Sequence, residues 1–216
     1  MEQLEKYLKP TFTIDSNSRP IRAKADELTR NQNDVASKAK SLFYFVRDQI
    51  KYVMYPQITR EEYFKASKTL QKGEGYCVQK AVLLTTLARA ADIPARLGFV
   101  DIVNHLLPQK HLALQGTNLF IYHGFTELHL NGKWIKATPA FDFDMCNENQ
   151  IIPIEFDGEN DTLFHPVNQE GKPHIEYTKF HGSYDDLPYT EIINACREVY
   201  GQKFVELMSE SSELSQ

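Results

Sequence analysis

The sequence predicts an α+β domain in which one buried helix packs on an antiparallel β-sheet. Residues 77–91 are apolar around most of the helical circumference, the pattern of a helix that is covered on all sides. Residues 120–130 and 133–138 read as two strands joined by Asn131-Gly132. That dipeptide suits a type I′ turn, which needs positive φ at both positions, so the two strands are expected to form a hairpin.

Upstream of the buried helix, residues 1–30 are mixed and polar, with Pro10 and Pro20 as breaks. A helix is expected to begin near Asn33, which can cap it, with Asp34 in its first turn. Apolar residues then recur at helical spacing: Ala39, Leu42, Phe43, Val46 and Ile50. A short extended segment over residues 52–55 and a turn at Gly73 and Gly75 precede Cys77.

Downstream, Pro94 ends the central helix and residues 96–103 are rich in strand-forming types. Beyond Phe141 the pattern is looser, with short strands such as residues 175–178. A last helix is expected from Thr190 to about Leu207. The polar residues 209–216 are expected to be a disordered tail.

Composition limits the class of protein. Of 216 residues, 42% are hydrophobic and 25% charged, which predicts a packed core. The net charge of -5 argues against nucleic-acid binding. The first ten residues lack a signal-peptide pattern, and the longest apolar stretch is too short and too polar to span a bilayer. The three cysteines are few and odd in number, which does not suit a disulfide framework. We therefore expect a cytoplasmic protein without membrane contact, and the oligomeric state is open.

Cys77 lies at the first turn of the central helix, directly after two glycines. Helix N-terminal amides and the helix dipole favour the thiolate, which is the nucleophilic form of cysteine. The same amides can donate to an oxyanion formed when sulfur attacks a carbonyl. The alternative is a small buried cysteine with only a packing role. Position alone does not decide between them.

A wider pattern favours the chemical reading. Residues 75–84 (GYCVQKAVLL) and 87–96 (LARAADIPAR) resemble the nucleophile helix of the transglutaminase-like superfamily. Residues 123–128 (HGFTEL) and 132–134 (GKW) resemble the histidine strand of that family and the tryptophan after its turn. The resemblance covers residues 36–142, and the remainder is similar to stand-alone bacterial members. It implies a papain-like fold, with residues 1–208 as a single domain and residues 143–208 as its C-terminal elaboration.

The resemblance also implies a chemistry. Cys77 would be the nucleophile and His123 its base in thiol-dependent acyl transfer or hydrolysis on an amide of a peptide or protein. Hydrolysis is favoured over cross-linking, because water needs no dedicated second site. No cofactor or metal is expected. The rival interpretation is an inactive module of the same family that binds a peptide or a protein partner.

The family's third catalytic group is a carboxylate that orients the histidine, and it usually lies in an Asp-Pro pair. This sequence has Thr138-Pro139 at that place. If Asn131-Gly132 forms a two-residue turn, His123 falls opposite Ala140. Thr138 and Asp142 are then its two diagonal neighbours on one face. We expect the carboxylate of Asp142 to orient His123. Thr138 is the competing candidate, and an ordinary loop acid is the alternative for Asp142.

Other candidates favour structural roles. The seven histidines show no HExxH motif, and no paired CxxC is present, so structural zinc is not expected. Gln71 precedes Cys77 by six residues, the spacing of the oxyanion-hole glutamine in papain-like proteases, but one residue at one spacing is attributed to chance. Cys146 and Cys196 are expected to be inert free thiols.

Overall fold

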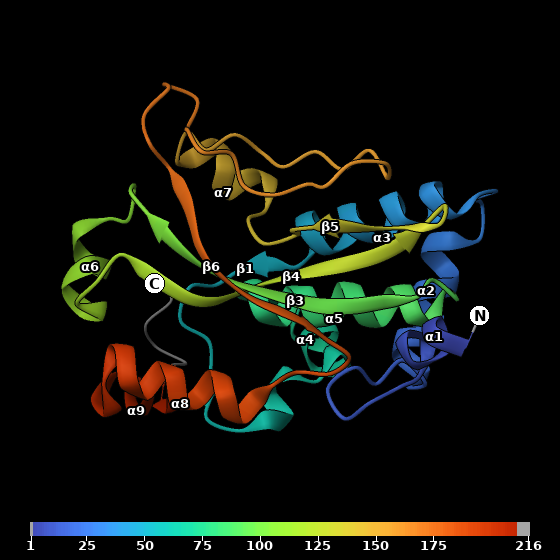
Figure 1. Cartoon of the computed structure of the whole chain (residues 1–216), viewed down its shortest axis with the longest axis horizontal. Helices are drawn as coiled ribbons and strands as arrows, with labels where there is room; N and C mark the ends of the chain where they lie inside the picture. Colours follow the sequence, from blue (N-terminus) through green and yellow to red (C-terminus); the bar gives the residue numbers. More distant parts are fainter. Residues whose placement is uncertain (1, 211–216) are drawn as a thin grey trace.

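A computed structural model describes residues 2–210, with side chains from residue 4 to residue 208. Figure 1 labels its elements. The helices are α1 (Glu2–Glu5), η1 (Lys6–Leu8), α2 (Arg19–Thr29), α3 (Val35–Gln49), η2 (Glu61–Phe64), α4 (Ala66–Lys72), α5 (Cys77–Ala90), α6 (Gln109–Gln115), α7 (Phe143–Glu148), α8 (Tyr189–Tyr200) and α9 (Gln202–Glu210). The strands are β1 (Lys51–Tyr52), β2 (Glu74–Gly75), β3 (Ala95–Asn104), β4 (Leu119–Leu130), β5 (Lys133–Ala137) and β6 (Ile175–Tyr184).

The main sheet is antiparallel and has the strand order β5-β4-β3-β6. Its β4–β5 hairpin confirms the predicted register, because Leu130 pairs with Lys133. Asn131 and Gly132 have φ of 50° and 86°, as a type I′ turn requires. The short strands β1 and β2 form a separate parallel pair directly before α5.

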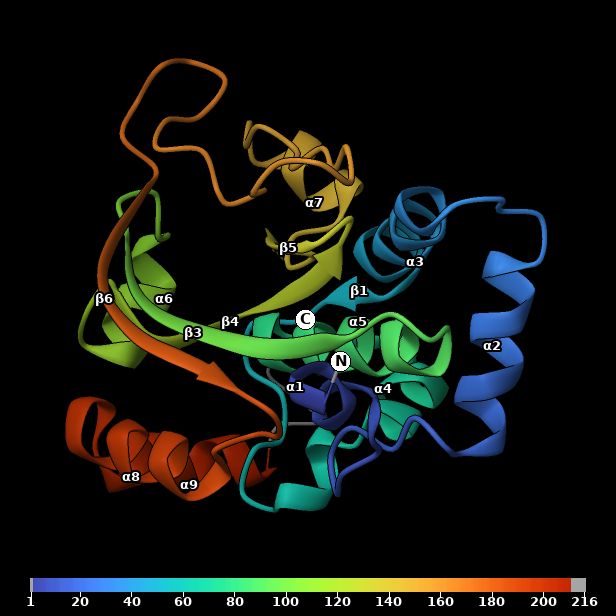
Figure 2. The same ribbon diagram turned by 45° about the vertical axis from the view of Figure 1, so that its right-hand side comes forward.

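Helix α5 is the centre of the molecule. It packs on β3 and β4 on one side and on α2, α3 and α4 on the other, as Figures 1 and 2 show. Every residue from Val78 to Arg89 is buried. Its contact with the sheet includes a hydrogen bond, since the Thr126 hydroxyl donates to the Ala81 carbonyl over 2.9 Å. The predicted α+β arrangement of a buried helix on an antiparallel sheet is therefore confirmed.

The N-terminal helices differ from the sequence prediction in two respects. Helix α3 is capped by Asp34 and not by Asn33, because the Asp34 carboxylate accepts from the Ser37 N–H over 2.8 Å. Helix α2 lies in a region that was read as mixed and polar. It buries only Ile21 and Ala25, too few apolar residues to give a clear periodicity.

The C-terminal region also differs. The expected last helix is two helices, α8 and α9, separated by Gly201 with φ of 86°. Strand β6 runs to Tyr184, well beyond the predicted short strand, and the short helices α4, α6 and α7 were not predicted. Of the expected disordered tail, residues 211–216 lie outside the described residues.

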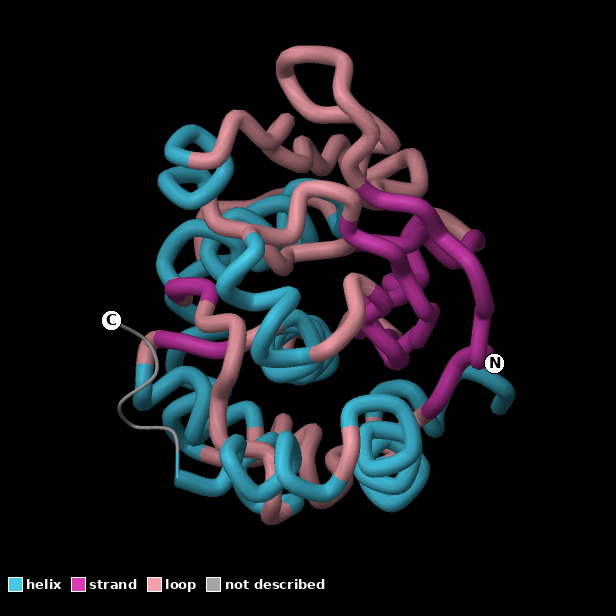
Figure 3. Tube along the Cα trace, turned by 90° about the vertical axis from the view of Figure 1, so that its left-hand side faces the viewer, coloured by secondary structure: helices cyan, strands magenta, loops and turns pink. Residues whose placement is uncertain are grey.

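Long loops crowd the top of the tube in Figure 3, and shorter ones run between the helices. The largest is residues 149–174, between α7 and β6. Within residues 2–210, no helix combines the length and the apolar character that crossing a bilayer demands.

Candidate active site

Cys77 is the first residue of α5, as predicted, and the start of that helix is fixed by Gln79. The Gln79 side-chain oxygen accepts from the Tyr76 N–H over 3.2 Å. Its amide nitrogen donates to the Tyr63 carbonyl over 2.9 Å. One side chain therefore ties the residue before Cys77 to η2, which limits movement of the sulfur.

Strand β4 approaches this helix start at Gly124. A Cβ built on Gly124 would lie 2.9 Å from the Cα of Val78, closer than real side chains come to backbone. Glycine is therefore required for β4 to pack so near α5. The close approach directs the Gly124 N–H to the sulfur of Cys77, where the N–H groups of Val78 and of Cys77 itself also act.

Burial and hydrogen bonding oppose each other at Cys77. Burial raises the pKa of its thiol to about 11, even though the three N–H groups favour the thiolate. The expectation that the helix start lowers this pKa is therefore not met, because desolvation outweighs the amides and the helix dipole.

His123 is 3% exposed and lines the same two cavities as Cys77. Among the described residues its Nε2 has no hydrogen-bond partner, and its ring lies against that of Phe164, with centroids 5.0 Å apart. Burial lowers the pKa of His123 to about 3. With the pKa of Cys77 far above that of His123, the resting pair at neutral pH is a thiol and a neutral imidazole.

A bulge in β4 sets the backbone just before His123. Strands β3 and β4 slip register between Val100 and Ile102, and Tyr122 has φ of 50°. The Asp101 carboxylate accepts from the Tyr122 N–H over 2.9 Å and lies 2.7 Å from Nε2 of His181, whose ring stacks on Tyr122. This cluster was not singled out from the sequence, because its members are far apart along the chain.

The structure uses Asp142 differently from the expectation. Strand β5 ends at Ala137, so the strand that would have carried Asp142 beside His123 stops too early. Asp142 instead caps α7, where its carboxylate accepts from the Met145 N–H over 2.8 Å, and its second oxygen accepts from the Tyr52 N–H over 2.8 Å. These contacts replace the expected one with the His123 ring.

Thr138, the competing candidate, is fully buried. Its hydroxyl has no hydrogen-bond partner among the described residues, like Nε2 of His123. Its N–H donates to the Thr162 carbonyl over 3.1 Å, which holds its backbone beyond the end of β5. Buried polar atoms without partners are uncommon and call for an explanation.

Lys80, also on α5, is fully buried. Its Nζ donates to the carbonyls of Arg47 and Ile50 over 3.0 and 2.6 Å, at the C-terminal end of α3. Burial lowers the pKa of Lys80 to about 7, although Asp142 and Asp48 favour the charged form. Lys80 and Asp142 thus join α3, β1 and α7 beside the nucleophile helix, a structural role that the sequence reading missed.

Two cavities reach the thiol. The first, which we call the inner cavity, has a volume of about 60 Å³ and is closed on one side by residues of α8 and α9: Ile192, Cys196, Tyr200, Phe204 and Met208. The Tyr200 hydroxyl fastens α8 to β4, since it accepts from the Ile121 N–H over 2.9 Å and donates to the Leu119 carbonyl over 3.1 Å. A space this small does not hold a peptide, so α8 and α9 narrow the approach to the thiol on this side, although Cys77 itself is only partly buried.

The second cavity, of about 20 Å³, also contains Cys77 and His123. It shares Tyr52, Met54, Asn104 and Phe141 with a much larger cavity of about 800 Å³. We call this large cavity the polar groove. It runs past α7 and the loop before α6, and charged residues of both signs line it.

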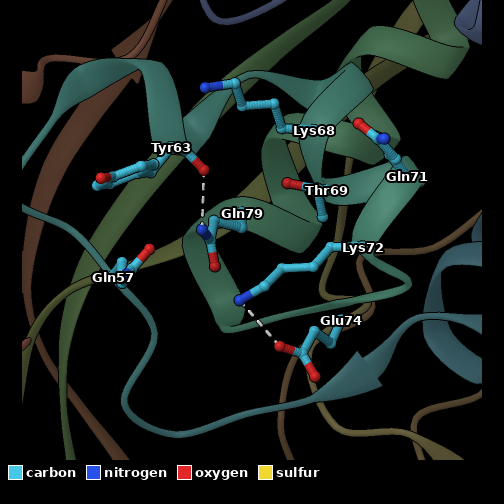
Figure 4. Close-up of a pocket in the computed structure, with 8 residues that line it drawn as sticks. All are labelled: Gln57, Tyr63, Lys68, Thr69, Gln71, Lys72, Glu74 and Gln79. Atoms are coloured by element: carbon cyan, nitrogen blue, oxygen red, sulfur yellow. Dashed lines mark hydrogen bonds and ion pairs between the residues drawn. The ribbon is translucent and has the colours of Figure 1, made fainter. Parts of the chain in front are cut away.

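Gln71 lies in a separate pocket, of about 440 Å³, drawn in Figure 4. It shares that pocket with Gln57 and Gln79, and with a Lys72–Glu74 ion pair of 2.9 Å. Neither cavity that contains Cys77 is lined by Gln71. The structure therefore gives Gln71 no place at the thiol, in agreement with attributing its spacing to chance.

Within residues 2–210, no three His, Cys, Asp or Glu side chains are grouped to hold a metal ion. Cys146 and Cys196 are buried, unpaired thiols.

Comparison with known proteins adds a family. The model of the transglutaminase-like superfamily matches residues 22–139, which is more than half of the chain. No curated protein sequence gives a match.

Among solved structures, a candidate cysteine protease from Cytophaga hutchinsonii is similar, with a TM-score of 0.51 and 18% identity over 87% of this chain. The chain spans 58% of that protein's length. The periplasmic domain of TgpA from Pseudomonas aeruginosa matches with a TM-score of 0.40 and 22% identity, over 56% of this chain and 42% of that domain. The likeness to the first structure concerns the fold, which is of the papain-like type.

Proposed function

Because the chain belongs to the transglutaminase-like superfamily, we propose that it is a thiol-dependent enzyme that cleaves an amide of a peptide or protein. The observation that carries this proposal is that Cys77 and His123 line the same cavity. There, three backbone N–H groups favour the sulfur anion. A nucleophile, a base and oxyanion donors are the parts that acyl transfer from an amide requires.

The first half of the reaction forms a thioester. The sulfur of Cys77 attacks the amide carbonyl carbon while its proton passes to one ring nitrogen of His123, and the other ring nitrogen is left for an orienting group. The N–H groups of Gly124, Val78 and Cys77 donate to the oxyanion. The carbon–nitrogen bond breaks, and the leaving amine takes the proton from His123.

The second half regenerates the thiol. Water attacks the thioester carbon as His123 takes its proton, and the acid leaves as the proton returns to the sulfur. An amine in place of water would make a cross-link. We favour water because it needs no dedicated second site.

Thr138 is our candidate for orienting His123. Both its hydroxyl and Nε2 of His123 are buried without partners among the described residues, and continuing the β4–β5 register one residue past Ala137 makes Thr138 and His123 diagonal neighbours. A hydroxyl can hold a ring in place, but it does not offset imidazolium charge as a carboxylate does. A neutral resting pair is consistent with such a partner.

The rival is an inactive, peptide-binding member of the family. The absence of a carboxylate at Thr138 and the covered, neutral Cys77–His123 pair favour it. Hydrolysis of a peptide and amide library by the wild-type chain and by Cys77→Ala separates the two. Release of amine by the wild type alone supports the enzyme, whereas equal traces from both chains reject it.

A further inference from the structure

The polar groove is the largest cavity beside the thiol. Its volume of about 800 Å³ lies in the range of small-molecule and peptide-segment sites. It shares Tyr52, Met54, Asn104 and Phe141 with the small cavity at Cys77 and His123, so the groove adjoins the cavity that contains the thiol.

His174 stands out among the residues that line this groove. It is 1% exposed, and neither of its ring nitrogens has a hydrogen-bond partner in the described part of the chain. Its backbone is fixed, since its N–H donates to the Pro166 carbonyl and its carbonyl accepts from the His105 N–H, both over 2.8 Å. A buried ring held in place with two unused polar atoms lacks the partner that such groups normally have.

The surroundings of the ring restrict what that partner is. The ring centroids of Phe141 and Phe164 lie 6.3 and 6.2 Å away. Burial lowers the pKa of His174 to about 4, and His165 and His105 add to this effect. At neutral pH the ring is neutral and offers one N–H donor and one nitrogen acceptor. An amide offers the complementary pair, a carbonyl acceptor and an N–H donor, whereas a carboxylate only accepts and an ammonium only donates.

The rim of the groove does not select a charge. Lys51 and Lys110 lie on it together with Asp144 and Glu148, all four exposed. Asp48 and Asp142 also line the groove, but their carboxylates are already bound, to Arg47 and to the N–H groups of Tyr52 and Met145. Ligand recognition is therefore assigned to the uncharged interior at His174, next to aromatic side chains.

We propose that the polar groove binds an uncharged stretch of peptide and that His174 is a positioning residue, which hydrogen-bonds an amide of that stretch. This inference rests on the proposed function, because it places the peptide so that a neighbouring amide reaches Cys77. It names the substrate class as a peptide chain read through its amides.

The test uses Cys77→Ala, in which no reaction occurs, and acetyl-trialanine amide as the probe. Titration is followed through the ring ¹⁵N resonances of the histidines. We expect saturable binding with a shift of the His174 ring signals. His174→Phe, which keeps an aromatic ring without polar atoms, should weaken binding about tenfold. His174→Gln, whose carboxamide keeps a donor and an acceptor, should retain most of it. His165→Phe, at an exposed neighbouring histidine, is the matched control and should bind as the parent does.

The absence of saturable binding overturns the inference. So does an affinity in His174→Phe equal to that of the control, once thermal unfolding has shown that the variant is folded. Acylation of Cys77 in the wild-type chain is measured separately. A His174 response without acylation rejects the proposed enzyme and leaves the groove as a peptide site, whereas acylation without a His174 response rejects the groove alone.

Discussion

The backbone N–H of Gly124 favours the thiolate of Cys77, and β4 packs so near α5 at this residue that a Cβ on Gly124 would lie 2.9 Å from the Cα of Val78. Neighbouring backbone cannot move aside as a flexible side chain can. The spacing between β4 and α5 therefore sets both the donor on the thiol and the position of His123, the residue before Gly124.

Gly124→Ala should separate β4 from α5. We expect a loss of about 1–3 kcal/mol in the free energy of unfolding and at least a tenfold slower acylation of Cys77 by p-nitrophenyl acetate. Gly98→Ala is the control. Its Cβ would meet the ring of Phe125, so it also strains the sheet, but at residues that line neither cavity containing Cys77. If Gly98→Ala slows acylation of the folded protein as much as Gly124→Ala does, the specific role of Gly124 is rejected.

Substitutions at Thr138 and at Asp142 should have different effects. Those at Thr138 should disturb the orientation of His123, and those at Asp142 should lower the stability of the fold. Thr138→Val keeps the shape and removes the hydroxyl, so we expect about a tenfold slower acylation of Cys77, while Thr138→Ser stays close to wild type. Asp142→Asn should cost roughly 1–2 kcal/mol of stability, because it weakens the α7 cap and the contact with Tyr52. It should leave acylation of the folded protein unchanged. The opposite ranking of the two sites would return the orienting role to Asp142.

Tyr200 should control access to the thiol. Tyr200→Phe leaves the Ile121 N–H and the Leu119 carbonyl without their partner on α8, so the cover over Cys77 should loosen. We expect several-fold faster alkylation of Cys77 by iodoacetamide and a lower pKa of its thiol, since burial is what raises it. Tyr189→Phe, on the same helix and packed on Phe64, is the control. Labelling is measured for each cysteine by mass spectrometry, and equal rates in both variants would reject the cover.

The free energy of unfolding should fall in mild acid. The folded pKa values of His123 and His174, about 3 and about 4, lie below the ordinary value of 6.5. At a pH between the folded pKa of each histidine and 6.5, that histidine binds a proton in the unfolded chain but not in the folded chain. This contribution to stability is therefore complete above pH 6.5 and is lost as pH falls through the folded pKa, about 4 for His174 and about 3 for His123. His174→Phe should remove part of this slope, on the order of 2 kcal/mol between pH 7 and pH 4. Urea unfolding at several pH values measures it, and an unchanged slope would contradict the assignment.

The parts of this fold that the sequence predicts are those with a strong local signal. The apolar circumference of α5 and the Asn131-Gly132 turn each specify one element, and the structure contains both. Helix α2 and the break at Gly201 lack such a signal. Their placement depends on packing against distant parts of the chain.

In the candidate site, too, the features with a local sequence signal are predicted correctly and those that depend on tertiary packing are not. Strand parity gives the β4–β5 register correctly as far as Ala137. It does not reveal that the strand stops there, because Asp142 has stronger local partners at the start of α7. The thiol pKa is mispredicted for a related reason. A helix start is a local feature, whereas the cover from α8 and α9 is a tertiary one.

Acylation mapped residue by residue tests the central claim most directly. The wild-type chain is treated with p-nitrophenyl acetate, and the modified peptides are identified by mass spectrometry. The account predicts that the acyl group is found on Cys77 rather than on Cys146 or Cys196. It also predicts that His123→Gln slows the acylation of Cys77 by a factor of about 10² or more, because the base is lost. Equal labelling of all three cysteines, or an unchanged rate in His123→Gln, would contradict it.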